Sequence, residues 1–274
     1  MYSQNFEEKN KKELRIIYIG IILVLLSGIV TIFRPFLKQM KKDVSTEIQP
    51  NNLPKISAAD LIKKIRNEEN IHIVDIRSEE SFQNEHIVSS LNVPIENLNN
   101  FKFPFPLNDS VAIIGFATES QENQLAIEAI KNVGYNDVSV VTGGISAWKN
   151  SNGKIISKGS PSLLIDQSKI TYIAPDDLKV ILEKNTDSIL ILDVRAEQTF
   201  SQEHMAKAIN IFLEKLETDN SKISLGNQII TYGENEIDSF QSGVRLYDLG
   251  FYNVKVLKGG FTAWKEKGFP TTNQ

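Results

Sequence analysis

The chain has 274 residues, of which 41% are apolar, and it contains no cysteine. The apolar fraction is too high for a disordered protein, and the missing thiols exclude disulfides, zinc–thiolate sites, iron–sulfur clusters and cysteine nucleophiles. Residues 1–55 hold 9 basic and 5 acidic side chains, which leaves 21 basic and 29 acidic side chains for the remainder. The resulting net charge of −8 over residues 56–274 argues against a nucleic-acid partner.

Residues 16–33 (IIYIGIILVLLSGIVTIF) form an apolar segment without charge between Arg15 and Arg34. A helix of this length spans about 27 Å, close to the roughly 30 Å hydrocarbon core of a bilayer. We therefore expect a short tail at 1–15, one transmembrane helix at 16–33 and a spacer at 34–55. The alternatives are a buried helix of a soluble domain and a cleaved signal peptide, but no alanine precedes Ala58, so an A-x-A-like cleavage site is missing.

The orientation of this predicted helix is not fixed by its flanks. The positive-inside rule gives no preference, because four basic residues precede the segment and four follow it: Lys9, Lys11, Lys12 and Arg15, then Arg34, Lys38, Lys41 and Lys42. We expect a single-pass cell-membrane protein whose folded domains lie outside the cytoplasm. In the opposite orientation, the basic residues at 38–42 would contact the anionic cytoplasmic leaflet.

Residues 56–150 are predicted to form the first of two domains. Ser57 can cap a helix that runs to about residue 67, and short β-branched runs predict strands at 71–75, 111–115 and 138–141. A second helix is expected at 121–132, ended by Gly134, and a third at 144–148. The side chains expected on the buried faces of the first two helices are Leu61, Ile62 and Ile65, and Leu125, Ala126, Ala129 and Ile130.

Residues 151–169 are rich in Ser and Gly and predict a linker, whose apolar residues Leu163, Leu164 and Ile165 are expected to pack against a domain. Residues 170–270 then repeat the order of the first domain, with helices at 175–184, 237–248 and 260–265 and strands at 189–193, 227–231 and 254–257. This alternation predicts an α/β fold with a mostly parallel sheet flanked by helices in each domain. Ligands bind beyond the carboxyl ends of such strands, which directs attention to the loops at 116–122 and 232–238.

The two domains share an ordered set of landmarks at an offset of 116–118 positions. D-x-R is followed by F-x-x-x-H-[IM], an Asn, G-[YF] and finally G-G-[IF]-x-A-W. This set closely resembles rhodanese domains, the sulfurtransferase homology family, and covers everything after residue 55. The landmarks are Asp75, Arg77, Phe82, His86, Asn92, Gly134, Gly143, Gly144 and Trp148 in the first domain, and Asp193, Arg195, Phe200, His204, Asn210, Gly250, Gly259, Gly260 and Trp264 in the second.

The resemblance implies a catalytic cysteine after the central strand, in a loop whose backbone N–H groups converge on it. In that family the thiolate takes sulfane sulfur, typically from thiosulfate, and carries it as a persulfide. Counted back 26 residues from the first glycine of each pair, this position is Ala117 in the first domain and Gly233 in the second. Neither residue is a nucleophile, so the sequence predicts two inactive sites and no cofactor.

The other loop residues include carboxylates where the family favours residues that hold an anion. They are Thr118, Glu119, Ser120, Gln121 and Glu122 in the first domain, and Glu234, Asn235, Glu236, Ile237 and Asp238 in the second. One carboxylate about 5 Å from a bound anion costs on the order of 3 kcal/mol at an effective dielectric constant of 20, so thiosulfate is not expected to bind. A calcium site at the three second-loop carboxylates is the weaker reading, because no calcium-loop spacing accompanies them, and no metal site is predicted.

The remaining landmarks have ordinary structural explanations. The Asp–Arg pairs at 75/77 and 193/195 are expected to be structural ion pairs or helix caps rather than an acid and an anion clamp. His86 and His204 are expected to be buried and hydrogen-bonded rather than general bases, and Trp148 and Trp264 to anchor the last helices. The loop hydroxyls, which belong to Thr118, Ser120 and Ser239, lack an identified base.

The sequence thus predicts a membrane-anchored rhodanese-like tandem without enzymatic activity, which serves as a binding or scaffolding module for a protein partner. Three alternatives remain open. The altered loops could sense a small ligand or a metal ion, a partner could supply the missing thiol, or a cysteine-independent reaction could persist.

Overall fold

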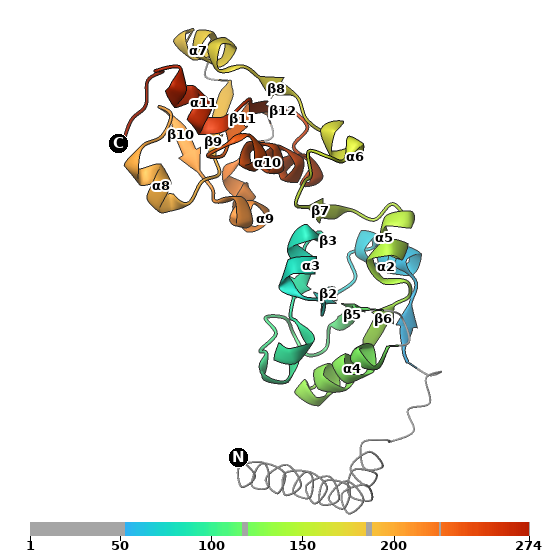
Figure 1. The fold of residues 1–274 in the computed structure, drawn as a ribbon. Coiled ribbons are helices and arrows are strands. Elements are labelled where there is room, and N and C mark those ends of the chain that lie inside the picture. The colour runs from blue at the N-terminus through green and yellow to red at the C-terminus, as the bar shows by residue number, and fades with distance from the viewer. Residues whose placement is uncertain (1–52, 117–119, 185–187, 225, 274) are drawn as a thin grey trace, which may run out of the picture. The chain divides into compact units, whose positions relative to one another are not determined.

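The computed structural model describes residues 53–116, 120–184, 188–224 and 226–273 (Figure 1). Residues Leu53–Gln274 form one compact unit, and all four apolar core clusters lie within it. We therefore expect this segment to fold without the residues that precede it. The predicted transmembrane helix at 16–33 lies outside the described residues, and inside the described ranges no helix combines the length and apolarity that a bilayer crossing requires.

The first repeat is built on a five-stranded parallel sheet in the order β1-β6-β5-β2-β4. Its strands are β1 (Lys55–Ile56), β2 (Ile71–Asp75), β4 (Leu91–Asn92), β5 (Ser110–Ile114) and β6 (Val138–Val141). The predicted strands at 71–75 and 138–141 are confirmed with their bounds, because β-branched runs of this length fit the buried centre of a parallel sheet. The two edge strands of two residues each were not predicted.

Helices cover both faces of this sheet. They are α2 (Ala58–Arg66), α3 (Glu79–Asn84), the 3-10 helix η1 (Ile95–Asn100), α4 (Gln121–Val133) and α5 (Gly144–Asn150). Figure 1 shows α4 on one side of the strands and α2 with α5 on the other. Side chains alternate accordingly along β5: Val111 and Ile113 belong to the cluster under α4, whereas Ala112 and Ile114 belong to the cluster under α2 and α5.

Two of the helix-face predictions need correction. Leu125 is 49% exposed, because the inward row of α4 is Asn123, Ala126, Ile127 and Ile130, and Leu125 lies about 100° away from Ala126 around the axis. Ile65 shares the inward side of α2 with the fully buried Leu61 but remains 41% exposed. It borders a cavity, which is described below.

The second repeat has the same architecture. Its parallel sheet has the order β10-β9-β11-β12-β8, with β8 (Tyr172–Ile173), β9 (Ile189–Asp193), β10 (Ala208–Asn210), β11 (Gln228–Tyr232) and β12 (Val254–Leu257). The helices are α7 (Pro175–Glu183), α8 (Glu197–Gln202), η2 (Leu213–Lys215), α9 (Leu216–Asp219), η3 (Asn220–Lys222), α10 (Glu236–Asp248) and α11 (Gly260–Glu266). The predicted tandem of α/β domains with parallel, helix-flanked sheets is therefore confirmed.

The segment predicted as a linker contributes structure of its own. Its strand β7 (Ile155–Ser157) pairs antiparallel with β3 (Glu85–Ile87), far back in the first repeat. Ser157 also donates two hydrogen bonds to Asp248 Oδ2, from its N–H at 3.0 Å and from its hydroxyl at 2.9 Å. The end of the first repeat is thus fixed to α10 of the second.

The prediction that Leu163, Leu164 and Ile165 pack against a domain was wrong. These side chains are 51%, 80% and 68% exposed around the short helix α6 (Leu164–Gln167). The buried residue is Asp166, which accepts a hydrogen bond from the Ser160 N–H at 2.9 Å and pairs with Lys169 at 3.1 Å. Because α6 is anchored through this charged side, its apolar side chains face solvent.

We predict that Asp166→Ala lowers the free energy of unfolding by about 1–3 kcal/mol, because Ser160 loses its acceptor and Lys169 loses one of its two carboxylates. Leu164→Ser on the same helix should change it by no more than about 0.5 kcal/mol, since Leu164 is exposed. Urea unfolding followed by circular dichroism measures both values. A larger loss for Leu164→Ser than for Asp166→Ala would contradict this assignment.

Candidate functional site

The candidate sites lie at the carboxyl ends of the central strands. In the first repeat Asp75 at the end of β2 is in register with Ile114 at the end of β5, and in the second repeat Asp193 is in register with Tyr232. The D-x-R segment and the loop after the central strand therefore leave the sheet side by side. This is the sheet edge at which parallel α/β folds place ligands.

In the first repeat the aspartate and the arginine of the D-x-R motif bind each other. Asp75, which is fully buried, accepts hydrogen bonds from Arg77 Nε at 3.0 Å and Nη2 at 2.6 Å. Arg77 also donates to the Glu85 carbonyl at 2.8 Å, so it links the end of β2 to the beginning of β3. Asn92 donates to the Asp75 and Arg77 carbonyls, each at 3.0 Å. Asp75, Arg77 and Asn92 thus bind one another and the local backbone, which is the arrangement of a structural ion pair.

The second repeat has the same ion pair with one addition. Arg195 binds Asp193 Oδ2 at 2.7 Å and also contacts Glu234 Oε2 at 3.1 Å, so it reaches the loop where the family carries its cysteine. Its guanidinium carbon lies 3.8 Å from the centroid of Phe261. Burial alone would lower the pKa of Arg195, but the hydrogen bonds and charges of Asp193 and Glu234 outweigh burial, so this pKa is raised. Glu234 is therefore not a free repulsive charge.

Three backbone N–H groups of the second loop donate to side chains of the same loop. The Gly233 N–H donates to Ser239 Oγ at 2.9 Å. The Ile237 and Asp238 N–H groups donate to Asn235 Oδ1 at 2.9 and 3.1 Å, so Asn235 acts as the N-cap of α10. In an anion-binding loop such donors would converge on the ligand. Here the amide oxygen of Asn235 and the hydroxyl of Ser239 accept these hydrogen bonds in place of a ligand.

Gly233 also leaves no room for a side chain. A Cβ atom at this position would overlap Asp238 Cβ and lie 3.1 Å from the Ser239 nitrogen. The loop additionally rests on α11, because the Phe261 N–H donates to the Gly233 carbonyl at 2.9 Å. A cysteine at this position would require the loop to move, so the sulfur-carrying geometry is absent as well as the thiol.

The first repeat has glycine at the equivalent place in space. Because Ile114 corresponds to Tyr232 in register, Gly115 corresponds to Gly233. A Cβ on Gly115 would overlap the side chain of Asn123, at the first-repeat position that matches Ser239. Counting from the glycine pair instead gives Ala117, since the first loop is two residues longer. Ala117, Thr118 and Glu119 lie outside the described residues, so the assignment of Ala117 stays a prediction.

The remaining first-loop residues start α4. Ser120 is its N-cap and accepts a hydrogen bond from the Asn123 N–H at 3.2 Å, while Gln121 and Glu122 form the first turn. A carboxylate at this position interacts favourably with the helix dipole. These residues thus have a helix-capping role in the structure.

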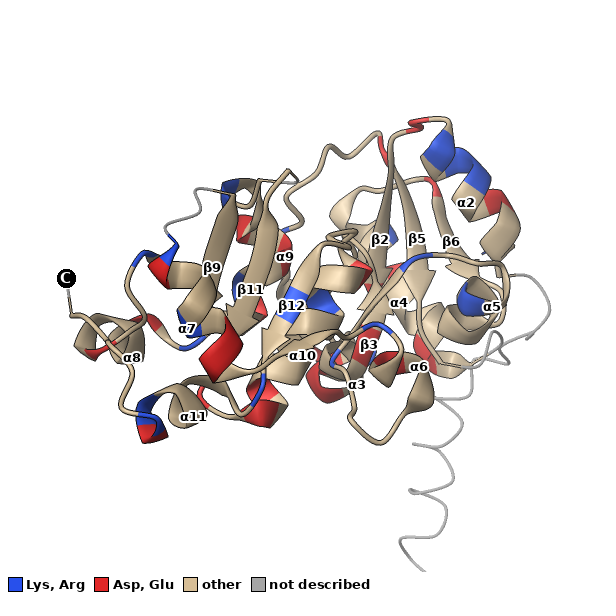
Figure 2. Ribbon diagram, turned by 90° about the horizontal axis from the view of Figure 1, so that it is seen from above, with Lys and Arg blue, Asp and Glu red and all other residues tan. Residues whose placement is uncertain are grey.

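A cleft of about 390 Å³ remains beside the second loop. It is lined by Arg195 together with three carboxylates, those of Glu214, Glu234 and Asp238. Figure 2 shows acidic residues at the beginning of α10, where this loop enters the helix. Within the described ranges, no group of three or more metal-ligating side chains is placed to hold a metal ion. The cleft therefore disfavours anions and presents no assembled metal site.

Tyr232 is the last residue of β11, and its ring centroid lies 5.6 Å from the guanidinium carbon of Arg195. It was not among the predicted site residues. Burial raises the pKa of Tyr232 well above its usual range, so its hydroxyl stays protonated and cannot act as a base. The hydroxyl accepts a hydrogen bond from the Met205 N–H at 3.1 Å. Its role is to hold the segment after α8 against β11.

His86 and His204 are buried, and each directs Nδ1 at a carbonyl four residues earlier, Phe82 and Phe200 respectively, at 2.8 Å. His86 makes a second contact that the sequence did not predict, from Nε2 to Glu217 Oε2 at 2.8 Å. Glu217 also accepts a hydrogen bond from the Ser89 N–H at 2.7 Å. Both ring nitrogens of His86 thus lie within hydrogen-bond distance of an oxygen atom.

Glu217, the partner of the His86 ring, was not predicted from the sequence. It stands 131 positions from His86, and nothing in its local pattern marks it. Ser239 was noted only as a hydroxyl without a base, although the spacing of Asn235 and Ser239 at the start of a helix signals local capping. The two last-helix tryptophans lie where the landmarks place them, both buried in the core.

Comparisons with known proteins agree with the landmarks. A family model described as the rhodanese-like domain matches residues 57–151 and 174–267. Thiosulfate sulfurtransferase GlpE of Coxiella burnetii is 32% identical over 77 residues, which cover 28% of this chain and 72% of that protein. GlpE of Shewanella oneidensis is 33% identical over 82 residues, covering 30% of this chain and 79% of that protein.

Solved structures are similar at a lower level. A thiosulfate sulfurtransferase from Pseudomonas aeruginosa is 18% identical with a TM-score of 0.44, covering 80% of this chain and 43% of that chain. A rhodanese-like domain from an Anabaena protein is 32% identical with a TM-score of 0.36, covering 38% of this chain and 79% of that chain.

The contact of Glu217 predicts a pH dependence of stability. Burial would raise the pKa of Glu217, but the hydrogen bond from His86, the Ser89 N–H and the charges of His86 and Arg245 lower it below its usual value. A carboxylate whose pKa falls on folding stabilises the protein above about pH 4.3, and this contribution is lost on further acidification. We expect Glu217→Gln to lower the free energy of unfolding at pH 7 by about 1–2 kcal/mol and to flatten its decline below pH 5.

Urea unfolding at several pH values measures this effect. Glu214→Gln, an exposed neighbour, is the matched control and should leave the profile unchanged. Parallel pH profiles of Glu217→Gln and the unmodified protein would contradict the assignment.

Proposed function

Because this chain belongs to the rhodanese-like domain family, we propose that it is a sulfurtransferase homologue without sulfurtransferase activity, used as a binding or scaffolding module. The observation that carries the proposal is the state of the second loop. Gly233 occupies the cysteine position, a Cβ there would overlap Asp238, and three N–H groups of the loop are already bound to the side chains of Asn235 and Ser239.

The chemistry of sulfur transfer explains why we propose that the chain lacks this activity. A persulfide forms only on a thiolate, and this chain contains no cysteine in any of its 274 residues. A hydroxyl cannot replace the thiolate without a base, and the described hydroxyls at the loops, those of Ser120 and Ser239, act as hydrogen-bond acceptors for backbone N–H groups. The intact fold is therefore proposed to serve recognition.

The membrane anchor is part of the same proposal. The uncharged segment at 16–33 is long enough for one bilayer crossing, and the spacer at 34–55 would separate the folded repeats from the lipid. We propose a single-pass membrane protein with the repeats outside the cytoplasm and a protein partner bound to them. Cross-linking in intact membranes followed by identification of the linked chain tests the partner, and protease accessibility of residues 53–274 in sealed vesicles tests the orientation.

The open cleft beside Gly233 supports a second candidate function, in which the cleft binds a ligand. The loops could sense a small cationic ligand, or the cleft could receive a thiol that a partner supplies. A thermal-shift series with cations and amines separates sensing from scaffolding. A scaffold should show no shift with any of these ligands.

The direct test of inactivity is thiosulfate-to-cyanide sulfur transfer by residues 53–274 and by the full chain. We expect a rate equal to that of a heat-inactivated sample, because no residue can carry the sulfur. GlpE of Coxiella burnetii, named a thiosulfate sulfurtransferase, is the positive control. Turnover clearly above the inactivated sample would refute the proposal.

We further expect that Gly233→Cys does not restore activity. A cysteine Cβ would overlap Asp238, and overpacking of this kind costs about 1–3 kcal/mol of stability. The same assay, with thermal unfolding as the companion measurement, gives both results. Ala117→Cys is expected to be inactive as well, because the first loop keeps Glu119 and Glu122. Efficient turnover by either variant would show that only the thiol is missing.

A further inference from the structure

A second cavity, of about 510 Å³, lies in the first repeat at the opposite end of the sheet from the degenerate loop. It opens beside the first residues of β2, whereas the loop follows the last residues of that sheet's central strands. Its walls are mainly aliphatic and aromatic, formed by Ile62, Ile65, Ile71, Ile87 and Trp148. A volume of this size is typical of small-molecule sites, which span roughly 300–1,000 Å³.

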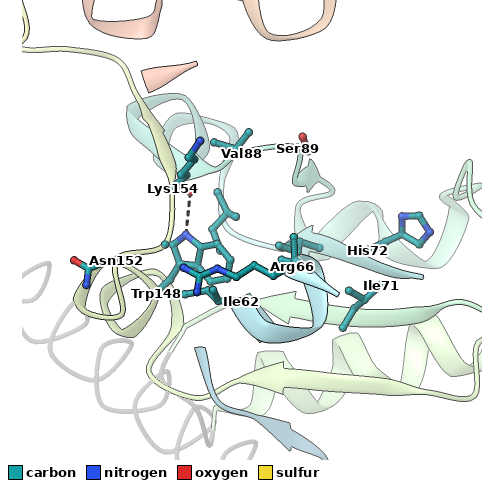
Figure 3. Close-up of a pocket in the computed structure, with 13 residues that line it drawn as sticks. Ile62, Arg66, Ile71, His72, Val88, Ser89, Trp148, Asn152 and Lys154 are labelled. Atoms are coloured by element: carbon teal, nitrogen blue, oxygen red, sulfur yellow. Dashed lines mark hydrogen bonds between the residues drawn. The ribbon is translucent and has the colours of Figure 1, made fainter. Parts of the chain in front are cut away.

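Two of the polar residues that line the cavity are cationic, and the others are His72, Ser89 and Asn152. Arg66 at the end of α2 and Lys154 ahead of β7 both line it, and the described residues that line it include no carboxylate. Neither side chain belongs to an ion pair within the described part of the chain. Figure 2 shows the basic end of α2, and Figure 3 shows the Arg66 side chain extending along the cavity toward Trp148. Two unpaired cations therefore border an apolar hollow in a segment whose net charge is negative.

The second repeat has an aromatic side chain at the corresponding position of the chain. Trp148 Nε1 donates to the Lys154 carbonyl and Trp264 Nε1 to the Pro270 carbonyl, both at 2.9 Å, so the two segments correspond. The residue before that carbonyl is Gly153 in the first repeat and Phe269 in the second. Phe269 packs edge-on against Trp264 with ring centroids 4.9 Å apart, and Lys179 covers the Phe269 ring.

The cationic pair is likewise specific to the first repeat. The helix position that holds Arg66 in α2 holds Glu183 in α7, and Lys154 corresponds to Pro270. The first repeat thus has Gly153, Arg66 and Lys154 at the positions where the second repeat has Phe269, Glu183 and Pro270. These differences favour the same kind of ligand.

We propose that this cavity binds an amphipathic carboxylate, a molecule with one carboxylate head and an aliphatic body. The aliphatic body would lie in the cavity and contact Trp148 and the isoleucines. The head would bind Arg66, whose planar guanidinium matches a carboxylate in two parallel hydrogen bonds, with Lys154 as the second charge. This site is independent of the inactive loops and would give the binding module a small-molecule ligand.

The probe is sodium octanoate below its micelle concentration, titrated into residues 53–274 by calorimetry. We expect one saturable site with a Kd below about 1 mM. Octan-1-ol has the chain without the charge and acetate has the charge without the chain, so both should bind at least about tenfold more weakly. The chain has two tryptophans, and Trp264→Phe leaves Trp148 in the cavity wall as the single fluorescent reporter.

Charge reversal locates the head group. Arg66→Glu and Lys154→Glu should each weaken octanoate binding about tenfold or more. Lys63→Glu lies on the same helix but does not line the cavity, so its affinity should stay within about twofold. Thermal unfolding of each variant confirms that it is folded. Using two separate reversals keeps the test valid if one of them unfolds the protein.

Several results would overturn the proposal. They are the absence of saturable octanoate binding, equal affinity for octan-1-ol, and unchanged affinity in both charge reversals. The full chain in lipid nanodiscs, with empty nanodiscs as the blank, should bind octanoate as residues 53–274 do. Loss of binding in the full chain alone would mean that residues 1–52 occupy the cavity, which would also overturn the proposal.

Discussion

The buried ion pair at the end of β2 and its copy at the end of β9 are the contacts on which the rest of each repeat depends. Asp75 and Asp193 are fully buried carboxylates, and each is satisfied by an arginine two residues later. Removal of one partner from such a pair leaves a charge without compensation and costs about 3–5 kcal/mol. Both arginines also bind a carbonyl eight residues further on. The pair therefore fixes the path of the chain between the sheet and the segment that contains the buried histidine, and this structural role accounts for the presence of D-x-R in both repeats.

The structure changes the physical argument against anion binding at the second loop. The sequence suggested repulsion between an anion and several free carboxylates. Glu234, however, is bound to Arg195, so one of these charges is compensated. The stronger barriers are geometric: Gly233 has no space for a Cβ, and the side chains of Asn235 and Ser239 accept hydrogen bonds from three N–H groups of the loop. The same hydrogen bonds make Asn235 the N-cap of α10, so this part of the loop serves to begin the helix.

Much of this architecture could be predicted from the sequence, because the central strands and main helices carry strong local patterns. The run 71–75 is β-branched and buried, and Gly134 ends α4 in a left-handed conformation that glycine adopts without strain. Two-residue edge strands have no period to detect, and the pairing of β3 with β7 joins segments about 70 residues apart. The contact of His86 with Glu217 and the cavity beside Arg66 arise only when distant segments meet. For the same reason, Leu163, Leu164 and Ile165 were assigned by their own hydrophobicity, whereas their exposure is set by the ionic anchor at Asp166.

The attachment of β7 to α10 has a consequence for how the protein unfolds. β7 is the antiparallel partner of β3 in the first repeat, and its last residue is held by the side chain of Asp248 at the end of α10. The same carboxylate binds Lys169 at 2.8 Å. If α10 melts, β7 loses its support, and β3 then loses its only strand partner among the described residues. We therefore expect the stability of the first repeat to depend on that of the second, through the hydrogen bonds between Ser157 and Asp248. A substitution that destabilises α10 should therefore also destabilise the β3–β7 pair of the first repeat.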